Sequence, residues 1–298
     1  MSRLIASFAA MAIAVSSMTV SATAGDVVDG TGATVKVENL SRLLSIGSDT
    51  TEILFALGLG NQIVAVDSTS TYPAEAKSKK IVGYLRALST EGVIATGASL
   101  ILANAHIGPP EVVRALRSSS VPMVILPGGE GPASLGEKVR LIGRAVAAEE
   151  KAEALVAKLE RDFQALGEAR SKVKKPLRAM VVLGVSGGRT QAGGKNTTAD
   201  LMLNLAGAEN VATSLQGYKP VSDEAVIELA PEVIVAARRT PDEDIASQIA
   251  ALPGFKALGA GGKVPIIVVD ATYLLGFGPR APEAAWELMA RIYPDQPR

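Results

Sequence analysis

The chain has 298 residues, and its 30 lysines and arginines balance 30 aspartates and glutamates. This balance argues against a nucleic-acid-binding surface, which carries an excess of basic residues. The chain has no cysteine and one histidine, His106, which excludes disulfides, thiolate metal sites and multi-histidine zinc or copper sites.

Residues 1–24 have the composition of a secretory signal peptide. A basic residue, Arg3, precedes an apolar run over 4–15, and residues 22–24 (Ala-Thr-Ala) match the pattern of a cleavage site. The apolar run is shorter than the about 20 residues that cross a bilayer as a helix. We therefore expect an exported protein whose mature chain begins near Gly25.

Short apolar runs alternate with helical patterns in the first half of the mature chain. The runs lie at 43–46, 63–66, 100–103 and 121–126, and the helical patterns include 51–57 and 111–118. This alternation is typical of a parallel sheet covered by helices.

A second set of apolar runs and helices follows in the other half. The runs lie at 179–185, 233–236 and 266–269, and the helical stretches at 199–206, 223–229 and 282–292. We therefore expect an α/β protein with two Rossmann-like lobes, each built on a central parallel sheet. The expected lobes cover residues 25–148 and 175–298.

Residues 149–174 separate the two sets and are expected to form one long helix that joins the lobes. This stretch has no proline, and its apolar residues recur at helical spacing among charged ones. The alternative is a crossover helix within one continuous sheet. Two lobes joined in this way leave a cleft, and ligands bind preferentially in clefts between domains.

Two segments superficially resemble enzyme motifs but lack required residues. The segment 192–197 follows a strand like a phosphate-binding loop, but Lys195 is followed by Asn196 rather than serine or threonine. The segment 184–188 has a glycine one position too early after Ser186 for a nucleophile elbow. Neither a nucleotide site nor a hydrolase is expected.

The segment 81–92, Ile-Val-Gly-Tyr-Leu-Arg-Ala-Leu-Ser-Thr-Glu-Gly, places Tyr84 after a glycine and two residues before Arg86. It closely resembles the iron-ligand segment of the periplasmic haem-binding proteins of bacterial haem importers. These are class III substrate-binding proteins, a class that also carries siderophores and vitamin B12. The segments 42–58 and 222–231 resemble the same class, so the likeness covers essentially the whole mature chain.

The resemblance implies the class III periplasmic binding protein fold and a carrier function without enzymatic turnover. The carrier would bind haem in the periplasm and deliver it to an ABC importer, a permease and ATPase complex in the inner membrane. An outer-membrane haem receptor would act upstream.

The resemblance also implies that Tyr84 is the axial ligand of the haem iron. A phenolate is a hard oxygen donor suited to ferric iron. A free tyrosine has a pKa of about 10, so a phenolate ligand depends on the charge of the iron and of a nearby cation. In the family an arginine approaches the tyrosine, and Arg238 and Arg239 are both candidates beside Arg86. The alternative is that Tyr84 is an ordinary loop tyrosine.

The glycine-rich stretch 184–198 resembles the family's loop that faces the haem. Its glycines permit close approach to a flat ring, and Arg189 and Lys195 are expected to meet the propionates. The alternative is a solvated hairpin. Some relatives have a histidine in this region and stack a second haem, but this chain has none there, which argues against two haems.

Three further residues are assigned roles. His106 follows the run 100–103 and is either a haem ligand or, more commonly for an isolated histidine, a structural or solvated residue. In the wider class, glutamates that head a helix in each lobe dock onto arginines of the importer, which implies Glu52 and Glu224 here. The alternative for Glu52 is helix capping, because Asp49 and Glu52 have capping-box spacing.

Two other functions compete with haem transport. A vitamin B12 or ferric-siderophore carrier would have the same fold, but the low aromatic content of 4%, with Trp286 as the one tryptophan, argues against such a large ligand. A secreted haem-dependent or metal-dependent enzyme would need an acid-base group beside an open coordination site, for which His106 alone offers little.

Overall fold

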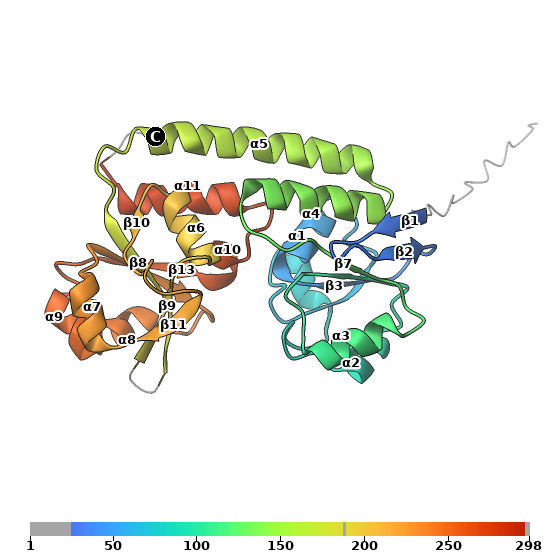
Figure 1. Ribbon diagram of the computed structural model, residues 1–298, viewed down its shortest axis with the longest axis horizontal. Helices are drawn as coiled ribbons and strands as arrows, with labels where there is room; N and C mark the ends of the chain where they lie inside the picture. The colour runs from blue at the N-terminus through green and yellow to red at the C-terminus, as the bar shows by residue number, and fades with distance from the viewer. Residues whose placement is uncertain (1–24, 187–188, 296–298) are drawn as a thin grey trace, which may run out of the picture.

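The computed structural model describes residues 25–186 and 189–295, which form two α/β lobes beneath one long helix (Figure 1). The predicted signal peptide, residues 1–24, lies outside the described residues. So do two glycines of the glycine-rich stretch, residues 187–188. Among the described residues, no helix combines the length and the apolar character needed to cross a membrane.

The N-terminal lobe is built on a parallel sheet of five strands in the order β5-β4-β3-β6-β7. Its central strands are buried on both faces, which explains why they are continuous apolar runs in the sequence. The strands are β3 (Leu43–Ile46), β4 (Ile63–Val66), β5 (Lys80–Ile81), β6 (Leu100–Ala103) and β7 (Met123–Ile125).

Helices and a small hairpin complete the N-terminal lobe. They are the antiparallel pair β1 (Gly25–Val28) and β2 (Thr34–Val37), the helices α1 (Ser48–Ala56), α2 (Thr90–Ile94), α3 (Pro110–Arg117) and α4 (Pro132–Ala145), and the 3₁₀ helix η1 (Ala74–Ser78). The short apolar runs predicted as strands are therefore present, with helices between them.

The C-terminal lobe contains a mixed sheet in the order β11-β9-β8-β12-β13, with β10 paired to β8. Its parallel part is the predicted one, β8 (Arg178–Ser186), β12 (Val233–Arg238) and β13 (Ile266–Asp270). Two antiparallel strands, β9 (Arg189–Gly193) and β11 (Tyr218–Val221), extend it. Much of the glycine-rich stretch is therefore sheet rather than loop.

The remaining elements cover this sheet. They are β10 (Glu209–Asn210) and the helices α6 (Thr198–Leu205), α7 (Asp223–Leu229), α8 (Ile245–Ala251), α9 (Pro253–Leu258), α10 (Ala271–Leu275) and α11 (Ala281–Ile292).

The long helix α5 (Glu149–Ser171) packs on α4 of one lobe and on α11 of the other (Figure 1). One apolar cluster runs through all three parts of the molecule. It includes Leu43 and Leu100 of the first sheet, Val156 and Leu159 of α5, and Val235 of the second sheet. The lobes are therefore joined by shared core packing as well as by the chain.

Candidate ligand-binding site

The candidate site lies at the carboxyl edge of the N-terminal sheet, where the loops after all five parallel strands begin. This edge faces the other lobe. Glu52 and Tyr72, which follow β3 and β4, contact Arg280 of the C-terminal lobe, and Glu130, which follows β7, lies near Thr198 of that lobe. Ligands of open α/β sheets bind outside the carboxyl ends of the strands, so this is the expected place for a site.

Tyr84 is held on this edge by the apolar residues around it. Leu88 is buried, and Val82 and Leu85 pack against the core on the α2 and α3 side of the sheet. Gly83 has φ +107°, a conformation that favours glycine, and it turns the chain between Val82 and Tyr84. The Tyr84 side chain is consequently 46% exposed, with no place in the core.

His106 lies beside the Tyr84 loop. The backbone of Gly108 donates to the Leu85 carbonyl at 2.9 Å and accepts from the Leu88 amide at 3.0 Å, so the two loops are paired. Burial, with a further contribution from the nearby Arg86 cation, lowers the pKa of His106. The structure therefore brings the loops that carry Tyr84, Arg86 and His106 together at this edge.

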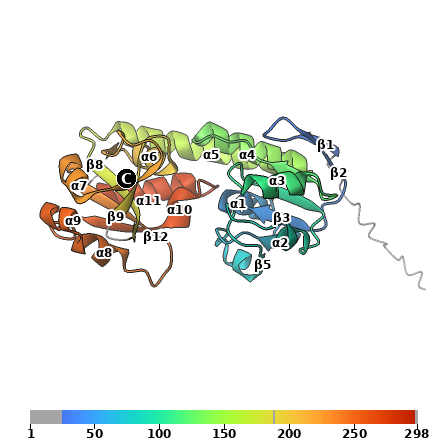
Figure 2. The ribbon, with the colours of Figure 1, turned by 60° about the horizontal axis from the view of Figure 1, so that its bottom comes forward.

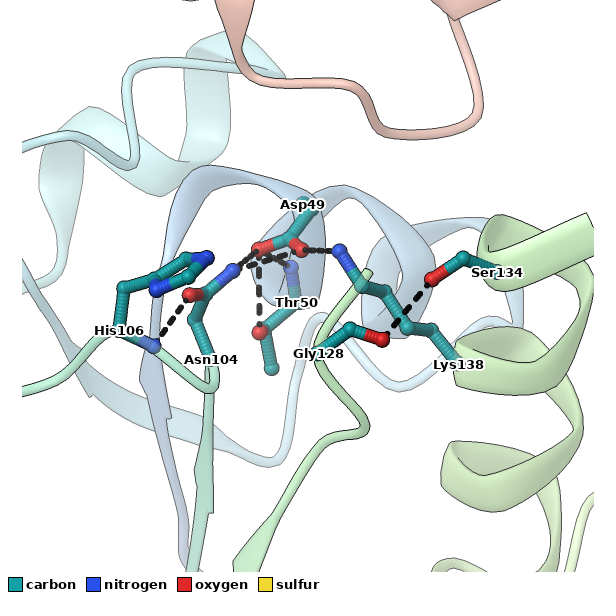
Figure 3. A network of polar contacts seen from close by, with 7 residues as sticks. All are labelled: Asp49, Thr50, Asn104, His106, Gly128, Ser134 and Lys138. Carbon is teal, nitrogen blue, oxygen red and sulfur yellow. Dashed lines mark hydrogen bonds and ion pairs between the residues drawn. The ribbon is translucent and has the colours of Figure 1, made fainter. Parts of the chain in front are cut away.

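A buried polar network supports the His106 loop (Figure 3). Asn104 donates to both carboxylate oxygens of Asp49, at 3.0 and 2.8 Å, and accepts from the backbone amide of His106 at 2.9 Å. Lys138 of α4 donates to the same carboxylate at 2.9 Å. The position of His106 is thus tied to the first turn of α1.

In the C-terminal lobe, three of the predicted basic residues gather at the carboxyl edge of the sheet. Arg189 pairs with Ser186 at the start of β9. Arg238 ends β12, which lies on the other side of β8, and Arg239 follows it directly. Arg239 lies across β8, since a Cβ at Gly184 would be 3.2 Å from its Nη2 atom. The Arg239 amide also donates to Glu243 at 2.7 Å, which fixes the loop that carries it.

Lys195 is not part of this group. Strand β9 runs away from the edge at about 3.3 Å per residue, and Lys195 follows its last residue, Gly193. Arg189 and Lys195 therefore lie at opposite ends of one strand, and the expectation that both meet the propionates stays a prediction.

The docking role expected of Glu52 is contradicted by its surroundings. Its side chain is 6% exposed, and its carboxylate accepts from Arg280 Nη2 at 2.6 Å and Nε at 3.1 Å. Burial raises the pKa of Glu52 even though Arg280 opposes this change. A carboxylate that is enclosed and paired in this way is not available to an outside partner.

Sequence reasoning missed Glu91, which matches Glu224 in position. Both glutamates are exposed in the first turn of a helix whose capping serine stands two residues earlier, Ser89 in α2 and Ser222 in α7. The shared pattern is Ser-x-Glu-x-Val-Ile, with the valine buried and the isoleucine exposed in both lobes. This repeated hexapeptide is visible in the sequence and could have identified Glu91.

The structure contains two cavities, one away from the candidate site and one between the lobes. One, of about 580 Å³, lies at the far end of α5 and is lined by residues such as Arg170 and Glu209, away from the carboxyl edges. The other, of about 420 Å³, lies between the lobes and is lined by Tyr72 and Lys77 on one side and by Tyr273 and Arg280 on the other. Tyr84 lines neither of them.

Comparison with known proteins gives both a family and a set of structural neighbours. The family model described as "Periplasmic binding protein" matches residues 43–273. A periplasmic heme-binding protein from Pseudomonas aeruginosa shares 31% identity with a TM-score of 0.80, covering 86% of this chain and 94% of that one. An apo periplasmic heme-binding protein from Roseiflexus sp. RS-1 shares 29% identity with a TM-score of 0.77, covering 85% and 98%.

The relatives found by sequence comparison are not named as heme-binding proteins, unlike the structural neighbours. An uncharacterized ABC transporter substrate-binding lipoprotein of Bacillus subtilis is 29% identical, covering 88% of this chain and 82% of the relative. A vitamin B12-binding protein of Pectobacterium atrosepticum is 28% identical, covering 84% and 88%. The similar proteins are therefore named for two different ligands, heme and vitamin B12.

Proposed function

Because the chain belongs to the periplasmic binding protein family, we propose that it captures haem between its lobes and presents it to its ABC importer. The protein has the class III fold and is a substrate-binding protein rather than an enzyme. Such a protein binds its ligand reversibly, so its function depends on the affinity for the ligand and on the release of the ligand to the importer. The composition of residues 1–24 supports export to the periplasm.

The observation that carries the haem assignment is the exposed Tyr84 on the carboxyl edge of the first sheet. Its loop is fixed by core residues on one side and by backbone pairing with the His106 loop on the other, so the phenol oxygen is presented without being packed. A fixed oxygen donor at a cleft edge suits a ferric haem iron.

Positive charge at both edges supports a ligand that carries carboxylates. Arg86 stands beside Tyr84, and Arg189, Arg238 and Arg239 stand at the edge of the other lobe. Guanidinium groups bind carboxylates through paired hydrogen bonds, so haem propionates fit these side chains. Of the two arginines at the end of β12, Arg239 is the better candidate to approach Tyr84, because it lies across Gly184 and Glu243 holds its backbone amide.

Glu91 and Glu224 are proposed to dock the importer. Each is an exposed carboxylate at an equivalent place in its lobe, and each has an exposed isoleucine, Ile94 or Ile227, one helical turn away. An importer with two similar halves would bind the same exposed glutamate and isoleucine on each lobe. This proposal replaces Glu52, whose carboxylate is enclosed.

A vitamin B12 carrier is the second candidate, and the similarity to vitamin B12-binding proteins favours it. The two ligands are separated by titrating the purified chain 25–298 with ferric haem and, in parallel, with cobalamin, and following absorbance. Haem is expected to give a saturable spectrum with a phenolate-to-iron charge-transfer band.

Tyr84→Phe should remove that band, whereas Tyr72→Phe should keep it. Tyr72 is a matched control because it is a comparably exposed tyrosine of the same lobe, at 45%. Saturable cobalamin binding without haem binding would contradict the assignment of haem as the ligand. An unchanged haem spectrum in Tyr84→Phe would contradict the assignment of Tyr84 as the iron ligand.

A further inference from the structure

A short segment of the C-terminal lobe, Gly276–Arg280, lies directly on the first helix of the N-terminal lobe. We call it the bridging segment. It connects α10 to α11, and α10 lies on the side of its lobe that faces the other one (Figure 2). It is therefore a second connection between the lobes, separate from α5.

The backbone of the bridging segment lies close against α1, with little room for a side chain. A Cβ at Gly276 would lie 2.9 Å from Ser48 Oγ, and a Cβ at Gly278 would lie 3.1 Å from Glu52 Oε2 and 3.3 Å from Asp49 Cα. Two glycines with one residue between them thus allow direct backbone contact between the lobes.

The residue between these glycines fixes the segment to the connecting helix. Phe277 has φ +47°, an unusual conformation for a residue with a side chain, and it is 7% exposed. Its ring stacks against Phe163 of α5, with ring centroids 6.1 Å apart. A strained backbone persists where surrounding packing determines it, so this burial holds the segment in place.

Arg280 completes the contact with charge and stacking. Its guanidinium binds both carboxylate oxygens of Glu52 and lies 3.6 Å from the ring centroid of Tyr72, two residues of the opposite lobe. Tyr273 of its own lobe is stacked 4.8 Å away. The paired geometry and the planar stacking both require arginine, because lysine offers neither.

We infer that the bridging segment sets the separation of the two lobes and that Arg280 is the positioning residue that holds it. Because its contacts are with residues that follow β3 and β4, it acts at the edge that carries the candidate site. The cleft is therefore preformed at one width before a ligand enters. This inference concerns the spacing of the lobes and holds for either ligand.

The absence of cysteine in the chain makes the inference directly testable. Ala115→Cys in α3 and Ser247→Cys in α8 place one exposed thiol on each lobe for nitroxide labels. Double electron-electron resonance on the ligand-free protein should give one narrow distance distribution. Arg280→Ala should broaden it and move its mean by about 2 Å or more, the scale of a domain rearrangement.

Two further variants separate positioning from general stability. Arg280→Lys keeps the charge but not the paired or stacked geometry, so it should give an intermediate distribution. Gly278→Ala should shift the distribution, because its new methyl would lie 3.1 Å from Glu52 Oε2 and 3.3 Å from Asp49 Cα and would displace them. Gly262→Ala is the matched control, because its new methyl would meet only the Gly259 carbonyl at 3.7 Å, within one lobe.

Unchanged distributions in both Arg280→Ala and Gly278→Ala would overturn the inference. If Arg280→Ala fails to fold by circular dichroism, Glu52→Gln and Tyr72→Leu decide in its place, since each removes one of its two contacts in the opposite lobe. Distributions like that of the parent in both of these variants would also overturn it.

Discussion

Lys138 and Asp49 form an ion pair that is almost completely removed from solvent. The Nζ and Oδ2 atoms are 2.9 Å apart, and the two side chains are 9% and 2% exposed. Asn104 donates hydrogen bonds to the same carboxylate from the other side (Figure 3). Because Asn104 also holds the His106 loop, this pair stabilises the edge on which the candidate site lies.

We predict that Lys138→Met lowers the free energy of unfolding by about 3–5 kcal/mol, because it leaves an unpaired carboxylate in the interior. The double variant with Asp49→Asn should recover much of this loss, since no buried charge remains. Urea denaturation followed by circular dichroism measures both. Lys158→Met, which removes the exposed pair with Asp162, is the control and should cost less than about 1 kcal/mol. Equal losses in Lys138→Met and the control would contradict the prediction.

His106 should titrate below the ordinary histidine value of 6.5, because burial and Arg86 both disfavour its charged form. The chain has one histidine, so a single imidazole signal in an NMR titration reports it. Arg86→Gln should raise the pKa, whereas Arg189→Gln in the other lobe should not. An unchanged pKa in Arg86→Gln would mean that the arginine is not near the ring.

The same shift has a consequence for stability. The unfolded chain takes up a proton at His106 near pH 6.5, while the folded chain does so only at lower pH. The contribution of His106 is therefore complete above pH 6.5 and is lost as the pH falls through the lowered value. His106→Asn should flatten this part of the curve of unfolding free energy against pH.

Arg239→Gln should weaken haem binding by about 10- to 100-fold, because a hydrogen bond to a charged group contributes about 1.5–3 kcal/mol. Arg238→Gln, at the adjacent position, should weaken it less, since Arg239 is the residue that lies across Gly184. Competition titrations of the two variants give the comparison. The reverse order would assign the role to Arg238.

Glu91→Ala and Glu224→Ala, alone or together, should reduce transport and the ATP hydrolysis of the importer that the binding protein stimulates, while leaving ligand affinity unchanged. Both side chains are exposed, so their removal should not disturb the fold. Glu111→Ala and Glu228→Ala remove exposed acids on α3 and α7 as controls. Equal loss of stimulation in all four variants would indicate a general charge effect instead of two docking positions.

The longer parallel strands could be predicted from the sequence, because a strand buried on both faces is a continuous apolar run. The two-residue strands β5 and β10 are not apolar runs and were not predicted. A hairpin was the alternative given for the glycine-rich stretch, and β8 and β9 form one, with β9 half-buried. The pairing of β9 with β11 could not be predicted, because it depends on distant residues. The sequence likewise could not reveal that Arg239 lies across Gly184, which requires the order of β8 and β12 in the sheet.

Glu52 shows why the docking prediction failed at one position, whereas the docking role of Glu224 stays a prediction. A glutamate near the start of a helix looks exposed from local spacing, but its partner, Arg280, is 228 residues away. The hexapeptide around Glu91 was available in the sequence, yet its meaning depends on exposure, which only the fold provides.

The apolar cluster that passes from one sheet through α5 to the other has a consequence for folding. The two lobes share one apolar cluster, because each completes its core with side chains of α5 and its neighbours. Calorimetry should therefore record a single transition whose van't Hoff and calorimetric enthalpies agree. A chain cut within α5 should yield two fragments that expose apolar core surface and aggregate, rather than two independently folded lobes.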